Sequence, residues 1–158
     1  MADVLLLYIT STGNTEIMAE AIAGYLEYNN HHVVIKTFDF DPIDVEELHD
    51  YDVVLIGTHS SDDGEIPFEA EDFYEELEDV DWRNGPVFAV FGSGDTAYDA
   101  FCLSVDLMGD KLEHLGAKLV PERFKVDLTP TEEELQQIER FAETAIQMAM
   151  GQAGTDPV

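Results

Sequence analysis

The chain has 158 residues, of which 45% are apolar, with 35 acidic and 7 basic side chains that give a net charge of −28. This length suits one compact domain with an ordinary core. The charge argues against nucleic acid as a partner, because so few cations cannot neutralise a phosphate backbone. No apolar run is long enough to cross a membrane and no secretory signal is evident, so we expect a cytoplasmic protein. The single cysteine, Cys102, excludes an internal disulfide and a cysteine-based metal site.

The acidity itself has three interpretations that can hold together. It can serve solubility, it can form a docking face for basic partners, or it can be an adaptation to a salty cytosol in which self-repulsion is screened. The composition does not choose among them.

Strand-like and helix-like patterns alternate along the chain. Strands are expected at Val4–Ile9, His32–Phe38, Asp52–Thr58, Pro86–Gly92 and Lys118–Val126, the last bent near Pro121. Helices are expected around Ile17–Leu26 and at Pro42–His49, Phe68–Leu77, Tyr98–Leu115 and Thr131–Met150. Residues 1–150 then form a single domain, and the tail 151–158 is expected to be disordered.

Five β-α pairs predict a three-layer α/β/α sandwich with a five-stranded parallel sheet, because right-handed crossovers leave few other arrangements. Ligands in such sheets bind beyond the carboxyl ends of the strands. Three polar loops occupy that edge, namely Thr10–Thr15, Thr58–Pro67 and Gly92–Asp99. We therefore expect these loops to form one site.

The first of these loops has the composition of a phosphate cradle. It contains Thr10, Ser11, Thr12, Gly13, Asn14 and Thr15, and no Lys or Arg lies near it. Backbone N–H groups at a helix start and four hydroxyls can hold a phosphate by hydrogen bonds alone. The loop lacks the lysine of a nucleoside triphosphatase, so phosphoryl transfer is a poor interpretation. The alternative is a plain N-cap turn rich in Asn, Ser and Thr.

These motifs resemble a known family. T-S-T-G-N-T after the first strand and FGSGDTAYDAFC (Phe91–Cys102) after the fourth are similar to short-chain flavodoxins, above all those of Gram-positive bacilli. The similarity covers almost the whole chain and implies the strand order 2-1-3-4-5. It also implies non-covalently bound flavin mononucleotide (FMN) whose phosphate is held and never transferred. The implied function is a low-potential one-electron carrier that shuttles between semiquinone and hydroquinone and is not an enzyme.

The resemblance also implies which residues contact the flavin. Tyr98 would lie flat on the outer face of the ring, and Ser93, Gly94 and Asp95 would contact the pyrimidine edge through their backbone. Cys102 would pack nearby as a small hydrophobic side chain. The remaining contacts would come from the loop after the third strand, with Thr58, His59, Ser60, Ser61, Asp62 and Asp63.

That loop is where the sequence departs from the family. Similar sequences read Trp-Gly-Asp-Gly where this chain has Ser61-Asp62-Asp63-Gly64. Losing the inner-face aromatic is expected to weaken FMN binding about tenfold. Asp62 in place of a flipping glycine is expected to stabilise the semiquinone less, because a positive φ is unfavourable for aspartate. His59 either covers the inner face instead or is an exposed loop histidine.

Acidic residues near the ring predict the partners. Asp62, Asp63, Glu65, Asp95 and Asp99 would disfavour an anionic reduced flavin and steer basic redox partners to its exposed edge. A ferredoxin/flavodoxin reductase and an acceptor enzyme fit this role, with the carrier as a monomer that binds no membrane. The alternative function is an FMN-poor or degenerate flavodoxin-like binding or regulatory module.

Overall fold

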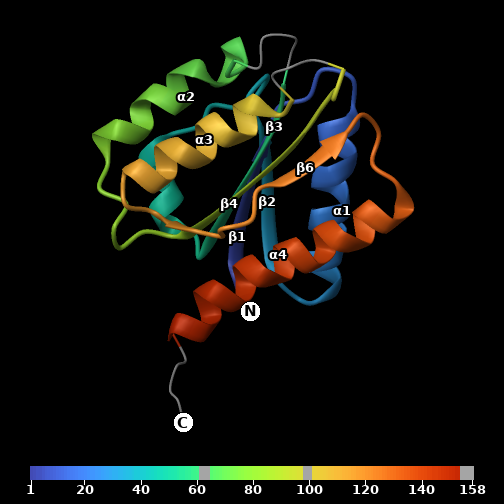
Figure 1. The fold of residues 1–158 in the computed structure, drawn as a ribbon. Helices are drawn as coiled ribbons and strands as arrows, with labels where there is room; N and C mark the ends of the chain where they lie inside the picture. Colours follow the sequence, from blue (N-terminus) through green and yellow to red (C-terminus); the bar gives the residue numbers. More distant parts are fainter. Residues whose placement is uncertain (61–64, 98–100, 154–158) are drawn as a thin grey trace.

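The computed structural model describes residues 1–60, 65–97 and 101–153. A parallel sheet in the order β2-β1-β3-β4-β5 runs through the centre of the molecule (Figure 1). Its strands are β1 (Asp3–Tyr8), β2 (His32–Thr37), β3 (Val53–His59), β4 (Val87–Gly94), β5 (Lys118–Leu119) and β6 (Phe124–Asp127). The predicted strand order and the three-layer architecture are confirmed.

Helices cover both faces of the sheet. They are α1 (Asn14–Tyr28), α2 (Glu71–Glu76), α3 (Leu103–His114) and α4 (Glu132–Ala153). Along β1, Val4 and Leu6 pack in a core with α1 and α4. Leu5 and Leu7 pack in the opposite core with α2 and α3. This alternation follows from the two-residue period of a strand, and it explains why the central strands are apolar throughout.

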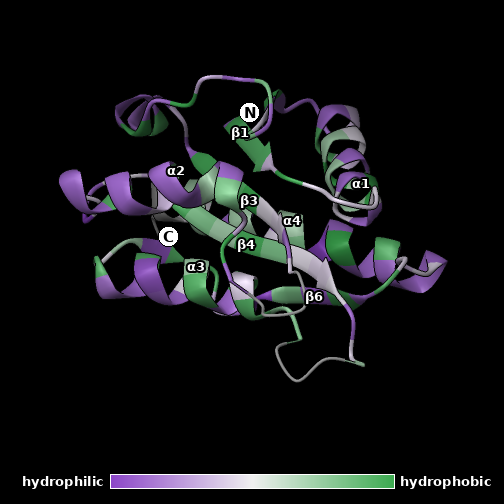
Figure 2. Ribbon diagram, turned by 90° about the horizontal axis from the view of Figure 1, so that it is seen from above, coloured by the Kyte–Doolittle hydropathy of each residue, from purple (hydrophilic) through white to green (hydrophobic). Residues whose placement is uncertain are grey.

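Figure 2 shows the same division by hydropathy, with apolar strands inside and helices whose outer sides are hydrophilic. Trp82 is fully buried, and its Nε1 donates to the carbonyl of Leu77 at 2.8 Å, as expected for a packing residue. Within the described ranges, no helix combines the length and apolarity needed to cross a membrane.

The predicted fifth strand is divided in two. β5 pairs with the start of β4 at Val87 and Phe88, whereas β6 pairs with its end from Phe91 to Gly94. Proline lacks a backbone N–H for a sheet ladder, so Pro121 interrupts the strand. The division brings the end of β6 to the carboxyl edge of the sheet.

Several predicted helix boundaries were wrong. α3 begins at Leu103, because Cys102 has a left-handed backbone with φ of 51°, and the predicted start at Tyr98 lies outside the described residues. α4 continues to Ala153, beyond the predicted end at Met150, since glycine at position 151 only weakens a helix by about 1 kcal/mol. The tail was expected to be disordered over 151–158; α4 includes 151–153, and 154–158 lie outside the described residues, so that expectation stays a prediction.

The two short predicted helices are partly 3₁₀. The segment predicted at Pro42–His49 is a 3₁₀ helix at Val45–Asp50. The one predicted at Phe68–Leu77 is α2 flanked by 3₁₀ turns at Phe68–Ala70 and Leu77–Asp79. Short helices favour this tighter winding, which adds no new element to the fold.

Candidate functional site

A cavity of about 290 Å³ opens at the carboxyl edge of the sheet. Its walls come from all three predicted loops and from the residue that follows β6. The lining residues are Ser11, Thr12, Asn14, His59, Ser60, Ser93, Gly94, Asp95 and Leu128. The predicted convergence of the three loops is therefore present, and Leu128 is an addition that the sequence reasoning missed.

The phosphate-cradle sequence forms a tight turn that starts α1. Gly13 is the N-cap residue with φ of 96°, and its N–H donates to Thr10 Oγ1 at 2.9 Å. The first intrahelical bond runs from the Ile17 N–H to the Gly13 carbonyl at 3.0 Å. An N-cap glycine has no side chain to satisfy the earlier N–H groups of the helix. Those donors and the positive end of the helix dipole are therefore available at the cavity.

Gly13 is also suited to the approach of a ligand. A Cβ built at this position meets no atom within 4 Å, so the space beside it is open. The left-handed φ favours glycine over other residues. Thr10 closes the turn and does not line the cavity, whereas Ser11 and Thr12 are exposed and do.

Thr15 anchors the phosphate-cradle loop to the sheet. Its side chain is fully buried, and its Oγ1 lies 2.8 Å from Ser93 Oγ, with either hydroxyl as the donor. This hydrogen bond joins the first turn of α1 to the end of β4. Thr15 therefore positions the cradle and is not itself open to a ligand.

The end of β3 presents its side chains alternately to α1 and to α3. A Cβ on Gly57 would lie 3.1 Å from Thr15 Cγ2, so position 57 faces α1. Thr58 faces α3, because its Oγ1 donates to Ser104 Oγ at 3.4 Å. Ser60 lies on the same side, 2.7 Å from Ser104 Oγ. By the two-residue period, His59 shares the α1 face with position 57.

His59 is the last residue of β3, where it is paired in register with Ser93. Its carbonyl accepts from Ser104 Oγ at 2.8 Å and from Thr58 Oγ1 at 3.2 Å. Its side chain is half-buried and lines the cavity. The alternative that it is an exposed loop histidine is therefore wrong. Its Nδ1 is buried and has no hydrogen-bond partner within the described ranges.

The loop after β4 is held by β6. Asp127 accepts from the Thr96 N–H at 3.1 Å and from Thr96 Oγ1 at 2.8 Å. Asp95 caps the same turn by accepting from the Ala97 N–H at 2.9 Å. The Leu128 N–H donates to the Gly94 carbonyl at 2.8 Å. These bonds give the loop a defined shape beside the cavity.

Asp127 and Leu128 were missed because the loop that follows the fifth strand was not considered. Leu128 has φ of 62°, is half-exposed and supplies an apolar wall. The next residue, Thr129, donates from Oγ1 to Asn14 Oδ1 at 3.1 Å, which joins this loop to the cradle. The sequence could have indicated these residues, because they follow a strand of the parallel sheet and ligands bind at the carboxyl ends of such strands.

Cys102 does not reach the cavity. It is fully buried, and a Cβ on Gly94 would lie 3.0 Å from its Sγ. Burial raises the pKa of the thiol to about 11, although Lys125 opposes the shift. A thiol with this pKa is protonated at neutral pH and is a poor nucleophile. The residue packs behind Gly94 as a small hydrophobic side chain.

Four of the predicted flavin contacts lie outside the described residues, namely Ser61, Asp62, Asp63 and Tyr98. The expected consequences of Ser61 and Asp62 for flavin binding remain predictions. So does the stacking of Tyr98 on the outer face of the ring.

A doubly wound parallel sheet with an uncapped helix start at its carboxyl edge defines a flavodoxin-like nucleotide-binding protein. The sequence model of the family named flavodoxin matches residues 6–141. "Probable flavodoxin 1" of Bacillus subtilis is 38% identical over 143 residues, which cover 90% of this chain and 89% of that protein.

Solved structures agree with this assignment. Oxidised flavodoxin 2 from Bacillus cereus is 40% identical, with a TM-score of 0.84 over 93% of this chain and 99% of that one. A short-chain flavodoxin associated with a bacterial microcompartment is 32% identical, with a TM-score of 0.86 over 94% and 99%. The chain belongs to the flavodoxin family, in its short-chain form. It is accordingly an FMN-dependent electron-transfer protein and not an enzyme.

Proposed function

We propose that FMN binds non-covalently in the cavity, with its phosphate in the Thr10–Thr15 loop and its ring toward Gly94, Asp95 and Leu128. The observation that carries this placement is the start of α1, where a glycine N-cap leaves N–H donors at a cavity lined by hydroxyls. The FMN phosphate would accept from the N–H donors at the start of α1. The flat apolar ring of FMN would lie against Leu128, on the other side of the cavity.

The donor set fits a phosphate that is bound and not transferred. Neutral hydroxyls and backbone N–H groups satisfy phosphate oxygens by hydrogen bonds, and the helix dipole adds roughly 0.3–1 kcal/mol, or about 2 kcal/mol when partly buried. No Lys or Arg is among the residues that line the cavity. Transfer of the phosphoryl group would call for such a cation, whereas storage of an electron on the ring does not.

Bound FMN supplies the one-electron chemistry, and the protein's residues hold it and set its electrostatic surroundings. Asp95 and Asp127 lie at the loop beside the proposed ring position, where negative charge disfavours an anionic reduced ring. At about 10 Å and an effective dielectric of about 60, one such charge is worth roughly 0.5 kcal/mol, or about 20 mV. The group of acids would therefore make the carrier a low-potential one.

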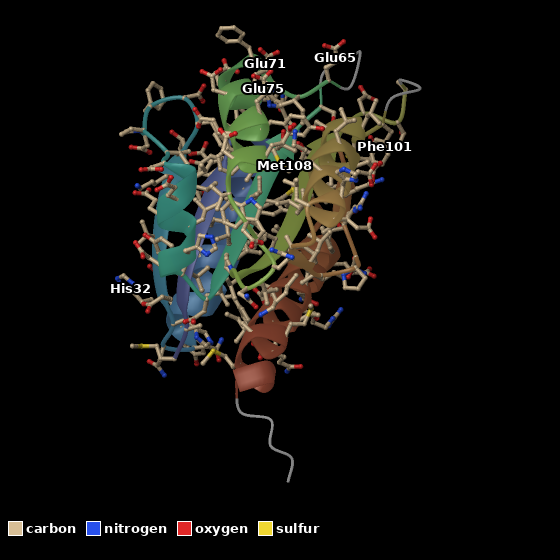
Figure 3. The ribbon with its side chains drawn as sticks, turned by 90° about the vertical axis from the view of Figure 1, so that its left-hand side faces the viewer. His32, Glu65, Glu71, Glu75, Phe101 and Met108 are labelled. Atoms are coloured by element: carbon tan, nitrogen blue, oxygen red, sulfur yellow. The ribbon has the colours of Figure 1, made fainter. Side chains whose placement is uncertain are left out.

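The proposed docking surface lies at the same end of the molecule. Glu65, Glu71 and Glu75 gather there, at the top of Figure 3, around a shared shallow pocket. A negative surface steers basic partners and favours weak, fast association. We propose a basic ferredoxin/flavodoxin reductase and an acceptor enzyme as partners, and a monomeric carrier that works in the cytoplasm.

The test is a titration of apoprotein with FMN, followed by flavin fluorescence, and extraction of the nucleotide from freshly purified protein. Stoichiometric quenching and a yellow protein that releases FMN are expected. A colourless protein with no quenching would favour the regulatory-module alternative. Reduction by a basic reductase should also slow as salt is added, because the attraction is screened.

A further inference from the structure

We propose that His59 is a titratable phosphate ligand, whose protonated imidazole donates to the FMN phosphate so that FMN is held more tightly at mildly acidic pH. The inference rests on the proposed function and adds a charge to a cradle that otherwise has only neutral donors. It also assigns His59 to the phosphate end of the cavity, and not to the inner face of the ring.

The fold places His59 on the side of the sheet where the cradle lies. A Cβ at position 57 would lie 3.1 Å from Thr15 Cγ2 in the first turn of α1, and the Ser93 hydroxyl lies 2.8 Å from Thr15 Oγ1. His59 follows position 57 by two residues and is paired with Ser93. Its side chain therefore projects toward the start of α1, where Ser11, Thr12 and Asn14 line the same cavity.

The imidazole has hydrogen-bonding capacity that the described part of the protein does not use. Nδ1 is buried and has no partner there, and the side-chain bonds around it go to the carbonyl of His59 and not to the ring. A buried polar atom without a hydrogen bond is unfavourable. The χ2 profile of histidine is broad and two-fold, so a flip of the ring would bring Nδ1 to the cavity side. A phosphate beside the ring supplies the missing acceptor.

No other residue at the cradle can supply a positive charge. The lining residues include no Lys or Arg, and positions 61–64 and 98–100 contain no Lys, Arg or His. Lys125 on β6 points to α3, where its Nζ pairs with Asp106 at 2.7 Å. A protonated His59 would thus be the one cation that faces the bound phosphate among the described residues.

The other titratable groups around the ring are carboxylates. Among the described residues at this end of the sheet they include Glu16 on α1, Asp95 after β4 and Asp127 on β6. Carboxyl groups ordinarily titrate near pH 4, whereas histidine titrates near pH 6.5. The phosphate itself titrates near pH 6. Comparison with a variant that lacks only the imidazole removes the phosphate's own contribution.

The experiment measures the dissociation constants of FMN and riboflavin for apoprotein at about pH 6 and pH 8.5 in wild type, His59→Gln and His59→Lys. A charged hydrogen bond is worth about tenfold or more in affinity. We expect wild type to bind FMN about tenfold more tightly than His59→Gln at the lower pH and about equally at the higher one. Riboflavin, which has no phosphate, should show no such difference.

His59→Lys keeps a charge at both pH values, so its advantage over His59→Gln should not change with pH. His32→Gln is the matched control, because His32 is exposed beside Asp3, at the start of β2. The ³¹P signal of bound FMN should shift between the two pH values more in wild type than in His59→Gln. Circular dichroism checks that each variant is folded.

Three outcomes separate the claims. A pH-dependent advantage for FMN alone supports the role of His59. Equal affinities of wild type and His59→Gln at both pH values, with FMN tightly bound, would overturn that role and leave the proposed function standing. Failure of wild type to bind FMN at either pH would overturn the proposed function and this inference together.

Discussion

The two faces of the sheet at the end of β3 differ in how their polar groups are satisfied. On the α3 face, the hydroxyls of Thr58, Ser60 and Ser104 bond to one another and to the His59 carbonyl. The Ser104 N–H also donates to Ser60 Oγ at 3.1 Å. On the α1 face, Ser11 and Thr12 are exposed at the cavity and the His59 ring has an unpartnered nitrogen within the described ranges.

This difference separates structural polar groups from those that can serve a ligand. Both faces carry Ser and Thr near the carboxyl edge, so the presence of hydroxyl side chains does not distinguish them. A hydroxyl whose bonds are all internal stabilises the fold, because an unsatisfied buried group is costly. A hydroxyl that faces a cavity is free to exchange water for a phosphate oxygen. Mutations on the two faces should therefore affect different measurements.

The largest effect is expected from Gly92→Ala, which tests how tightly the α3 face is closed. A Cβ at position 92 would lie 2.0 Å from the Thr58 carbonyl oxygen and 2.6 Å from Val105 Cγ2. Because a backbone atom in a central strand cannot move aside easily, we expect a loss of about 3 kcal/mol in the free energy of unfolding. Urea denaturation of the apoprotein measures it.

Gly24→Ala is the control for this substitution. It lies in α1, where an added Cβ meets nothing within 4 Å. Alanine at an open helical position should stabilise the protein by about 0.5–1 kcal/mol. If Gly92→Ala were as stable as wild type, the close packing between β3, β4 and α3 would be disproved.

The next largest effects are expected from removing one hydroxyl on each face of the sheet. Ser104→Ala leaves the Thr58 and Ser60 hydroxyls with fewer partners and should cost about 1–3 kcal/mol of stability, with little change in the FMN dissociation constant. Thr12→Ala should leave stability within about 0.5 kcal/mol and raise that constant about tenfold. Denaturation and fluorescence titration measure the two quantities. Equal effects of both variants on both measurements would remove the distinction between the faces.

The smallest effect concerns Cys102 behind the loop of Gly94. Burial raises its thiol pKa to about 11, so the native protein should resist iodoacetamide at about pH 8 and react readily in urea. A raised pKa in the folded state stabilises the fold at lower pH, and this contribution is lost as pH rises from about 9 to about 11. Cys102→Ala should therefore flatten the stability profile in that range. Rapid alkylation of the native protein would contradict the burial of the thiol.

Much of the fold could be read from the sequence. Apolar runs such as Val4–Ile9 and the helical spacing after them predict a parallel sheet covered on both faces, because the period of apolar residues is a local property. The ends of helices were less predictable where one backbone dihedral angle sets the residue at which the helix begins. Cys102 delays the start of α3, and nothing in its residue type indicates a left-handed φ of 51°.

For the site, the sequence by itself determined which loops meet at the carboxyl edge and that the first is a cradle of neutral donors. Only the tertiary structure decided that Thr15 is a buried support, that Asp127 holds the loop after β4, and that Leu128 lines the cavity. It also decided that His59 shares the α1 face with the cradle. The physical reason is that the polar composition of a loop is a local property, which can be read directly from the sequence. The side of a strand that a residue faces, and the partners it finds there, depend on register and on packing between segments far apart in the chain.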